Sequence, residues 1–414
     1  MDRPTVERAV WDFYHRWHLH ERTLGRDDGQ ILDFDMAPGP ADAPAPFASR
    51  LDALRALGEL CAAVADAAAL LPGATFLAAK LRGSEAYLRA LMGERWAFDA
   101  YLRATMGIEA GAPDDATLAE EASALAALFA GRGVAWSEAG RAAFRSVLGK
   151  PDVAALAQQL PREAERWVER VRSHIAVPAP EYAIEVVCED AYWANWIDGS
   201  RATGVRLRVN THDRIEYVAG SETTLAAHEI AGHAVHVAAL RRSAERGTVS
   251  GAALNLTVHG CEAFQMEGLA QTAMHALAEV DELSADVLLL DRFAAYKAEI
   301  VNRAQLEVER GGAVDEAAAR ALAACPLIKP LTLLSDLRDR GRHPLFRAYT
   351  HVYAPSRRLF SRAAALDAAR RWRFFEQAYT RLMTPAELGA LVEALEAERV
   401  PARAPGPTEG IGAS

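Results

Sequence analysis

Cysteine is scarce in this chain of 414 residues. The four cysteines, at positions 61, 188, 261 and 325, lie far apart and form neither a disulfide pattern nor a cysteine-rich zinc pattern. A structural zinc site, which is usually closed and rich in cysteine, is therefore not expected. The simplest interpretation is a reduced, cytoplasmic protein.

Long apolar runs and a leader segment are also lacking. No run of about 18 apolar residues occurs, and residues 1–7 show no basic region followed by an apolar one. We therefore expect no membrane span, no membrane partner and no secretion signal. Hydrophobic residues make up 51% of the chain, which is enough for a large globular core.

Positive charge is in deficit, because the formal net charge is −10. This balance argues against a nucleic-acid partner. Lysine occurs only at positions 80, 150, 297 and 329, so arginine is the ordinary cation of this chain. Arginine clusters such as residues 338–342 are accordingly interpreted as solvated faces.

Helical patterns cover most of the chain. Residues 5–22 carry aromatic residues at helical spacing, and residues 47–175 are rich in alanine and leucine with helical periodicity. Proline and glycine mark a linker at 37–46 and a boundary at 178–180. We divide the chain into a helical N-terminal region, a second region that carries the chemistry, and a disordered tail, at residues 1–177, 178–400 and 401–414.

Two strands precede the segment of greatest interest. Residues 182–188 and 204–210 have strand character, and a helix follows from about Ser221 to about residue 242. The predicted fold class is α+β and mostly α, with a small β-sheet beside this helix. The edge of such a sheet is suited to holding an extended substrate by backbone hydrogen bonds.

The predicted helix contains the sequence His228-Glu229-Ile230-Ala231-Gly232-His233. Two histidines can bind a zinc ion while the adjacent glutamate activates water as a general base. Residues five apart lie about 140° from each other on a regular α-helix, at about 100° per residue, and would not share one ion. A π-type bulge, helped by the flexible Gly232, would align them, and would also turn His236 toward the site without making it a ligand.

A catalytic zinc ion usually has a third protein ligand. Glu267 is our preferred candidate, because a carboxylate among apolar neighbours is costly unless it is paired or bound to a metal. Glu262, His259 and Cys261 lie close by in the sequence and stay open as alternatives. Two histidines and one carboxylate suit zinc well.

The first motif and the later Glu267-Gly268-Leu269-Ala270 together resemble a zinc carboxypeptidase family with His-Glu-xxx-His and Gln-Glu-Gly-Leu-Ala motifs. This family includes the tubulin tyrosine carboxypeptidases and belongs with the Glu-zincin metallopeptidases. The resemblance covers about residues 205–271 and implies that His228, His233 and Glu267 bind zinc and that Glu229 is the general base. Met266 stands where the family usually has Gln or Glu, and Ala231-Gly232 stands where it usually has Gly-Thr.

Peptide hydrolysis also needs a donor for the oxyanion that forms on the attacked carbonyl. Tyr349, His351 and Tyr353 are the candidates, and on a helix the two tyrosines would share a face. A carboxypeptidase further needs a cation for the terminal carboxylate, for which arginine is suited. The sequence offers four arginines for this role without deciding among them: Arg206, Arg208, Arg338 and Arg347.

We therefore expect a zinc-dependent metallopeptidase, and from the resemblance a carboxypeptidase, acting on a peptide or small amide. Two alternatives stay open. One is a metal-dependent amidohydrolase or tailoring enzyme with a small biosynthetic substrate, and the other is a non-catalytic helical binding protein. Trp193 and Trp196 are either substrate-pocket walls or core residues. The oligomeric state is not indicated by the sequence.

Overall fold

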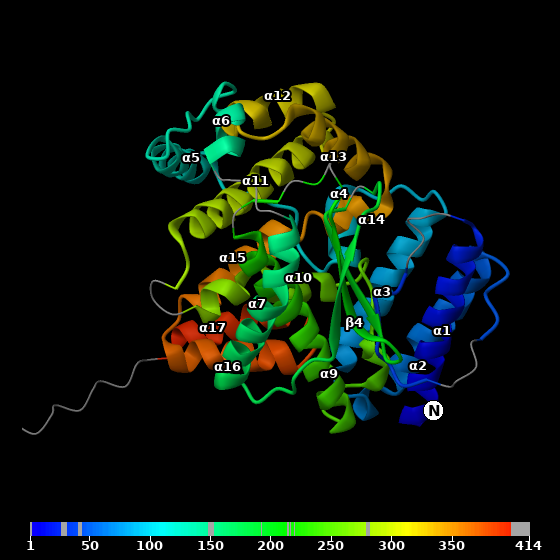
Figure 1. The fold of residues 1–414 in the computed structure, drawn as a ribbon. Coiled ribbons are helices and arrows are strands. Elements are labelled where there is room, and N and C mark those ends of the chain that lie inside the picture. The colour runs from blue at the N-terminus through cyan, green and yellow to red at the C-terminus, as the bar shows by residue number, and fades with distance from the viewer. Residues whose placement is uncertain are drawn as a thin grey trace, which may run out of the picture.

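Helices form most of this protein, and a small sheet lies among them in the middle of the molecule (Figure 1). Helices hold 66% of the residues and strands 6%, which confirms the predicted α+β, mostly α class. Among the residues described, no helix is long and apolar enough to cross a membrane. The computed structural model describes residues 2–25, 31–39, 44–147, 153–191, 193–212, 215, 217–218, 220–278 and 282–398.

The sheet has five strands in the order β2-β4-β3-β1-β5. Both strands that the sequence predicts are present, as β2 (Tyr182–Val187) and β4 (Gly204–Asn210), and they pair in parallel. β3 (Asn195–Ser200) runs antiparallel to β4. Two very short strands, β1 (Phe34–Asp35) and β5 (Asn255–Leu256), complete the sheet from distant parts of the chain.

One face of β4 is apolar because its side chains alternate between the two faces of the sheet. Val205, Leu207 and Val209 are buried and belong to the same apolar cluster as Ile230. Ile230 lies within residues 228–233, the segment predicted to bind a metal, which we call the metal motif. The sheet and the helix that carries the motif therefore share one core. This packing fixes the position of the metal motif relative to the strands.

The N-terminal helices form one side of the molecule. The predicted helix at residues 5–22 is confirmed as α1 (Arg3–Thr23), which packs with α2 (Arg50–Asp66) and α3 (Ala74–Leu91). Trp17 and Tyr14 are fully buried in their apolar cluster. The short helix η1 (Ala68–Leu70) lies between α2 and α3, and α4 (Phe98–Thr105) follows α3.

A second helical group has its own apolar cluster and lies at the top of the view in Figure 1. Its longest member is α11 (Ala285–Glu309). The other helices of this group are α5 (Asp115–Ala130), α6 (Gly140–Val147), α12 (Val314–Ala324) and α13 (Pro330–Arg342).

The remaining helices surround the metal motif. The motif itself lies in η2 (Ala226–Ala234), a π-helix that continues α8 and leads into α9. The others are α7 (Val153–His174), α8 (Ser221–Leu225), α9 (Val235–Glu245), η3 (Gly251–Leu254), α10 (Glu262–Leu277), α14 (Pro344–Tyr349), α15 (Tyr353–Ala364), α16 (Ala368–Thr380) and α17 (Pro385–Ala397).

The division of the chain at residue 177 stays a prediction. The largest apolar cluster contains Trp167 from before this point and Leu207 from after it. The tail predicted at residues 401–414 lies outside the described residues.

Gly232 allows η2 and α10 to approach each other closely. A Cβ atom built on Gly232 would lie 2.5 Å from the Cα of Ala270 and 2.7 Å from its Cβ. Both helices are buried here, so neither has room to move aside. Glycine at this position is therefore needed for close packing as well as for a flexible backbone.

We expect Gly232→Ala to lower the free energy of unfolding by about 1–3 kcal/mol, because the added methyl group overpacks the contact with α10. Gly389→Ala is the matched control, since nothing lies within 4 Å of a Cβ at that helical glycine. The control should be neutral or stabilising by up to about 1 kcal/mol. Urea denaturation compares the two variants, and equal stability of both would contradict the close contact.

Candidate metal centre

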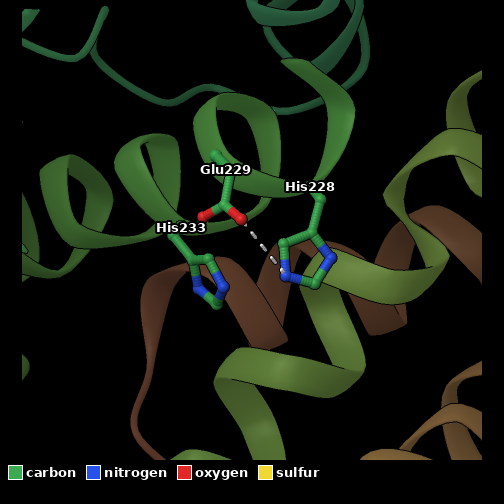
Figure 2. Close-up of side chains that lie close together, drawn as sticks. All are labelled: His228, Glu229 and His233. Atoms are coloured by element: carbon green, nitrogen blue, oxygen red, sulfur yellow. Dashed lines mark ion pairs between the residues drawn. The ribbon is translucent and has the colours of Figure 1, made fainter. Parts of the chain in front are cut away.

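The π-helix brings the two histidines and the glutamate of the motif together. In η2 the N–H of Val235 bonds to the carbonyl of Ile230, five residues earlier, so the helix is wider than an α-helix. His228, Glu229 and His233 each offer a ligand atom within 4.8 Å of the others. Figure 2 shows both imidazole rings and the carboxylate on the same side of the helix. The widening that the spacing predicts is therefore present.

The widened turn needs support from another helix. At the end of the π-helix the backbone hydrogen bonds change from a spacing of five residues to one of four. This change leaves the carbonyl of Ala231 without a donor from its own helix. The hydroxyl of Tyr379 in α16 donates to this carbonyl at 3.0 Å. His236 is fully buried against the Tyr379 ring and does not line the cavity at the motif, so the prediction that the widened turn points it toward the site is wrong.

Glu267 of α10 lies opposite His228. Its Oε2 atom is 3.6 Å from Nε2 of His228, and its Oε1 atom accepts the hydroxyl of Tyr349 at 2.6 Å. Oε2 of Glu267 and Nδ1 of His233 are buried and have no hydrogen-bond partner among the described residues. Buried polar atoms without partners are costly, and coordination of one cation would satisfy atoms of this kind. A zinc ion held by His228, His233 and Glu267 would satisfy these atoms, although the group of ligand atoms that lie within 4.8 Å of one another consists of His228, Glu229 and His233 and does not include Glu267.

The three alternative ligands have other partners. Glu262 forms a fully buried ion pair with Lys80 and accepts the N–H of Thr257 at 2.9 Å. His259 contacts the Ser84 hydroxyl at 3.0 Å and stacks on an aromatic ring. Cys261 is buried, and burial raises the pKa of its thiol. Glu267 is the only one of the four candidates that lines the cavity at the motif.

Electrostatics in this site favour a bound cation. Burial raises the pKa of Glu229 to about 8, the Glu267 carboxylate adds to the rise, and a hydrogen bond from Asn195 opposes it. Burial likewise raises the pKa of Glu267 to about 7. Burial lowers the pKa of His228 to about 4, so its imidazole is neutral at pH 7. Burial disfavours the charged form of both carboxyl groups, and a divalent ion bound between them and the neutral imidazoles would stabilise that charged form.

Asn195 positions the proposed general base. Its Nδ2 donates to Oε1 of Glu229 at 2.5 Å from the first residue of β3. The sequence does not indicate this contact, because the two residues are 34 positions apart and asparagine is not part of the metal-binding motif. Asn195 is thus a site residue that sequence reasoning missed.

The corner between α14 and α15 supplies two of the three predicted oxyanion donors. The hydroxyls of Tyr349 and Tyr353 are 2.9 Å apart, and both side chains line the cavity. Burial raises the pKa of both hydroxyls well above its usual range, so they keep their protons as donors. His351 lies elsewhere: its Nδ1 is 3.3 Å from Oε1 of Gln305, and it does not line the cavity.

The cavity in front of the motif has a volume of about 250 Å³ and mostly apolar walls. Trp193 and Trp196 line it, which agrees with the pocket-wall interpretation of these tryptophans. The other large apolar side chains of its wall are Phe34, Ile197, Met266, Leu345 and Phe346.

None of the four arginines proposed for a substrate carboxylate lines this cavity. Arg206 and Arg208 both pair with Asp198, at 3.1 and 2.5 Å. The guanidinium of Arg347 pairs with Glu309 at 2.7 Å, and that of Arg338 lies 3.5 Å from an acidic side chain of α12.

Comparison with known proteins gives a likeness of fold only. The chain matches no family model and no curated protein. Among solved structures it is similar to the putative lipoprotein from Colwellia psychrerythraea, with a TM-score of 0.54 over 84% of this chain and 70% of that chain. Sequence identity is 12%, so this likeness shows a shared fold and says nothing of the reaction.

The raised carboxylate pKa values predict how the metal-free protein responds to pH. A carboxyl group whose pKa is raised on folding stabilises the fold below its unfolded value of 4.5, and this stability is lost as pH rises through 7 to 8. The lowered histidine pKa values act in the opposite direction, but mainly below 6.5. We therefore expect stability of the chelator-treated protein to fall between about pH 6.5 and about pH 8.5.

Denaturant titration at the two pH values measures this effect. The double variant Glu229→Gln/Glu267→Gln should show a smaller fall, with Asp33 contributing the remainder because burial raises its pKa to about 8. Added zinc should flatten the wild-type profile. A metal-free protein that gains stability over this range would contradict the electrostatic account.

Proposed function

We propose that this protein is a zinc-dependent metallopeptidase that hydrolyses an amide bond of a peptide or small amide. The observation that carries the proposal is the meeting of His228, Glu229 and His233 in a π-helix with Glu267 from a neighbouring helix. A zinc ion bound there would supply a Lewis acid that polarises a carbonyl and lowers the pKa of water. The resemblance in the two motifs favours a carboxypeptidase within this class.

Glu229 is the proposed general base and, in the later step, the general acid. Burial raises its pKa to about 8, which supports a role in accepting a proton, and a bound zinc ion would lower this pKa. Asn195 holds the Oε1 atom, so the carboxyl cannot rotate freely. The proton taken from water would then pass to the leaving amine.

Tyr353 is our preferred donor to the developing oxyanion, with Tyr349 as its positioning partner. Tyr349 donates its only proton to Glu267, so Tyr353 is the donor in the 2.9 Å contact between the two hydroxyls, and it would turn this proton to the oxyanion when substrate binds. A fixed hydroxyl in a dry cavity stabilises negative charge better than water does.

Backbone groups of β3 support binding of an extended substrate. The carbonyl of Ala194 accepts a hydrogen bond from Asn210 of β4 at 2.9 Å. Because the backbone groups of successive residues in an antiparallel strand point to opposite sides, those of Asn195 and Ile197 point away from β4, toward the other edge of β3. Gly199, two residues on, donates at that edge to Asp33 at 3.1 Å. No backbone bond to Ile197 from this side is present in the described part of the chain, and Asn195 and Ile197 both line the cavity. A substrate strand could pair with them.

The proposal includes a reducing compartment such as the cytoplasm. All four cysteines are free thiols, two of them buried. Such thiols persist where disulfides are kept reduced.

Metal analysis of purified protein tests the site. We expect about one zinc ion per chain in the wild type and its loss in His233→Ala and Glu267→Ala, because a catalytic zinc site has three protein ligands. Cys261→Ala is the control: this alternative ligand should be dispensable. Zinc retained by Glu267→Ala, or no zinc uptake by the wild type, would contradict the ligand set.

Substrate profiling tests the reaction. A peptide library incubated with the zinc-loaded protein and followed by mass spectrometry should show amide hydrolysis. Glu229→Gln should lower kcat by about 10²–10⁴-fold while zinc content and stability are kept, because only the proton transfer is removed. Cleavage of small N-acyl amides without cleavage of peptides would favour the amidohydrolase alternative. Unchanged turnover in Glu229→Gln would exclude the proposed base.

A further inference from the structure

A second cavity adjoins the metal motif. It has a volume of about 550 Å³ and shares four wall residues with the first cavity, namely Asn195, His228, Glu229 and Tyr353. Its far wall comes from α11 and α13, helices of the second helical group. The small side chains of Ala270, Ala294 and Ala298 leave this space open. The motif therefore faces two cavities, one apolar and one that reaches α11.

Charged side chains line the second cavity, and most of them are paired. Asp291 lies between Arg357, with a bond of 3.0 Å, and His275, at 2.6 Å. Arg340 pairs with Asp336 at 2.9 Å. These pairs neutralise each other's charge, so they offer little net attraction to a charged ligand.

Lys297 is the exception. It lines the second cavity from α11, its side chain is exposed, and no acidic side chain in the described part of the chain lies within ion-pair distance of its ammonium. Desolvation lowers its pKa, Cys325 and Asp336 raise it, and the positive charges of Arg340 and Lys329 lower it further. An ammonium group that lines a cavity and has no ion-pair partner among the described residues is available to bind an anion.

We propose that the second cavity binds a carboxylate of the substrate and that Lys297 is its counter-ion. This inference rests on the proposed peptidase function and specifies its substrate class: peptides or amides with a free carboxylate close to the bond that is cut. Lys297 takes the role for which the sequence offered Arg206, Arg208, Arg338 and Arg347, all of which lie next to acidic side chains.

The geometry gives this assignment its specificity. A carboxylate held at α11 while the amide lies at the motif belongs either to a chain end or to an acidic side chain that passes from one cavity to the other, between residues that both cavities share. An internal peptide segment without an acidic side chain at this place would put an uncharged amide beside Lys297. The enzyme would then discriminate a free C-terminus from an amidated one through a single ammonium group.

Binding to an inactive variant tests the assignment without turnover. Zinc-loaded Glu229→Gln protein is mixed with a library of N-acetyl dipeptides bearing free C-terminal carboxylates, and separately with the same dipeptides as C-terminal amides. Ligand-observed NMR measures the affinities. We expect the acids to bind at least about tenfold more tightly than the amides, because an ion pair with Lys297 is made only with the acids.

Substitution of the lysine completes the test. Adding Lys297→Met should remove the preference for acids and leave amide binding unchanged, and Lys297→Arg should restore part of the preference. Lys329→Met is the matched control, since Lys329 is the N-cap of α13 and does not line the cavity. Equal binding of acids and amides, no binding of either, or a preference that survives Lys297→Met would overturn the proposal.

Failure of the two proposals can be told apart. A wild-type protein that prefers acids through Lys297 but hydrolyses no library member would refute the peptidase function and keep the carboxylate site. A wild-type protein that hydrolyses acids and amides at equal rates would keep the peptidase function and refute the role of Lys297.

Discussion

The widened turn of η2 is the constraint on which the rest of the site depends. Histidines five residues apart share one side of a helix only when the backbone hydrogen bonds skip one residue more than in an α-helix. The surrounding structure accommodates the change at two points. Tyr379 bonds to the carbonyl of Ala231, and the missing side chain of Gly232 lets α10 approach. The same approach brings Glu267 to His228, so one backbone irregularity fixes both the spacing of the histidines and the position of the opposing carboxylate.

Two kinds of buried carboxylate lie within this small region. Glu262 has an internal cation, Lys80, and together they bond to Thr257 at the cavity wall. Glu229 and Glu267 receive only neutral donors from the described residues, an amide and a tyrosine hydroxyl. The protein thus supplies a positively charged partner to Glu262 but only neutral hydrogen-bond donors to Glu229 and Glu267. A bound cation would be the missing counter-ion of these two carboxylates. This contrast supports a bound metal more strongly than the motif alone.

Local pattern was sufficient for part of this structure. The helical spacing and the length of the His-Glu-xxx-His interval led to the π-type turn, and the apolar company of Glu267 led to its place at the site. Tyr349 and Tyr353 are expected to share a face if they lie on one helix, but they end α14 and begin α15, and their hydroxyls meet at the corner between these helices. Contacts between distant segments could not be predicted from the sequence. Asn195 of β3 donates to Glu229 of η2, which no local pattern indicates. The strands β1 and β5 have two residues each, which is too short to show periodicity. The four arginines predicted as candidates for binding a substrate carboxylate were wrong for a related reason. Their acidic partners, such as Asp198 and Glu309, lie on neighbouring strands or other helices and could not be identified from the sequence.

The corner between α14 and α15 has a consequence for how the protein matures during synthesis. Tyr349 closes the site by bonding to Glu267, 82 residues earlier, and the corner itself is held by bonds from Asn302 and Gln305 of α11 to the carbonyls of His351 and Arg347. Tyr379, which supports the widened turn, is translated later still. A nascent chain that already displays both histidines thus lacks the groups that orient them. The site that we propose would therefore be assembled only after residue 379 has been synthesised.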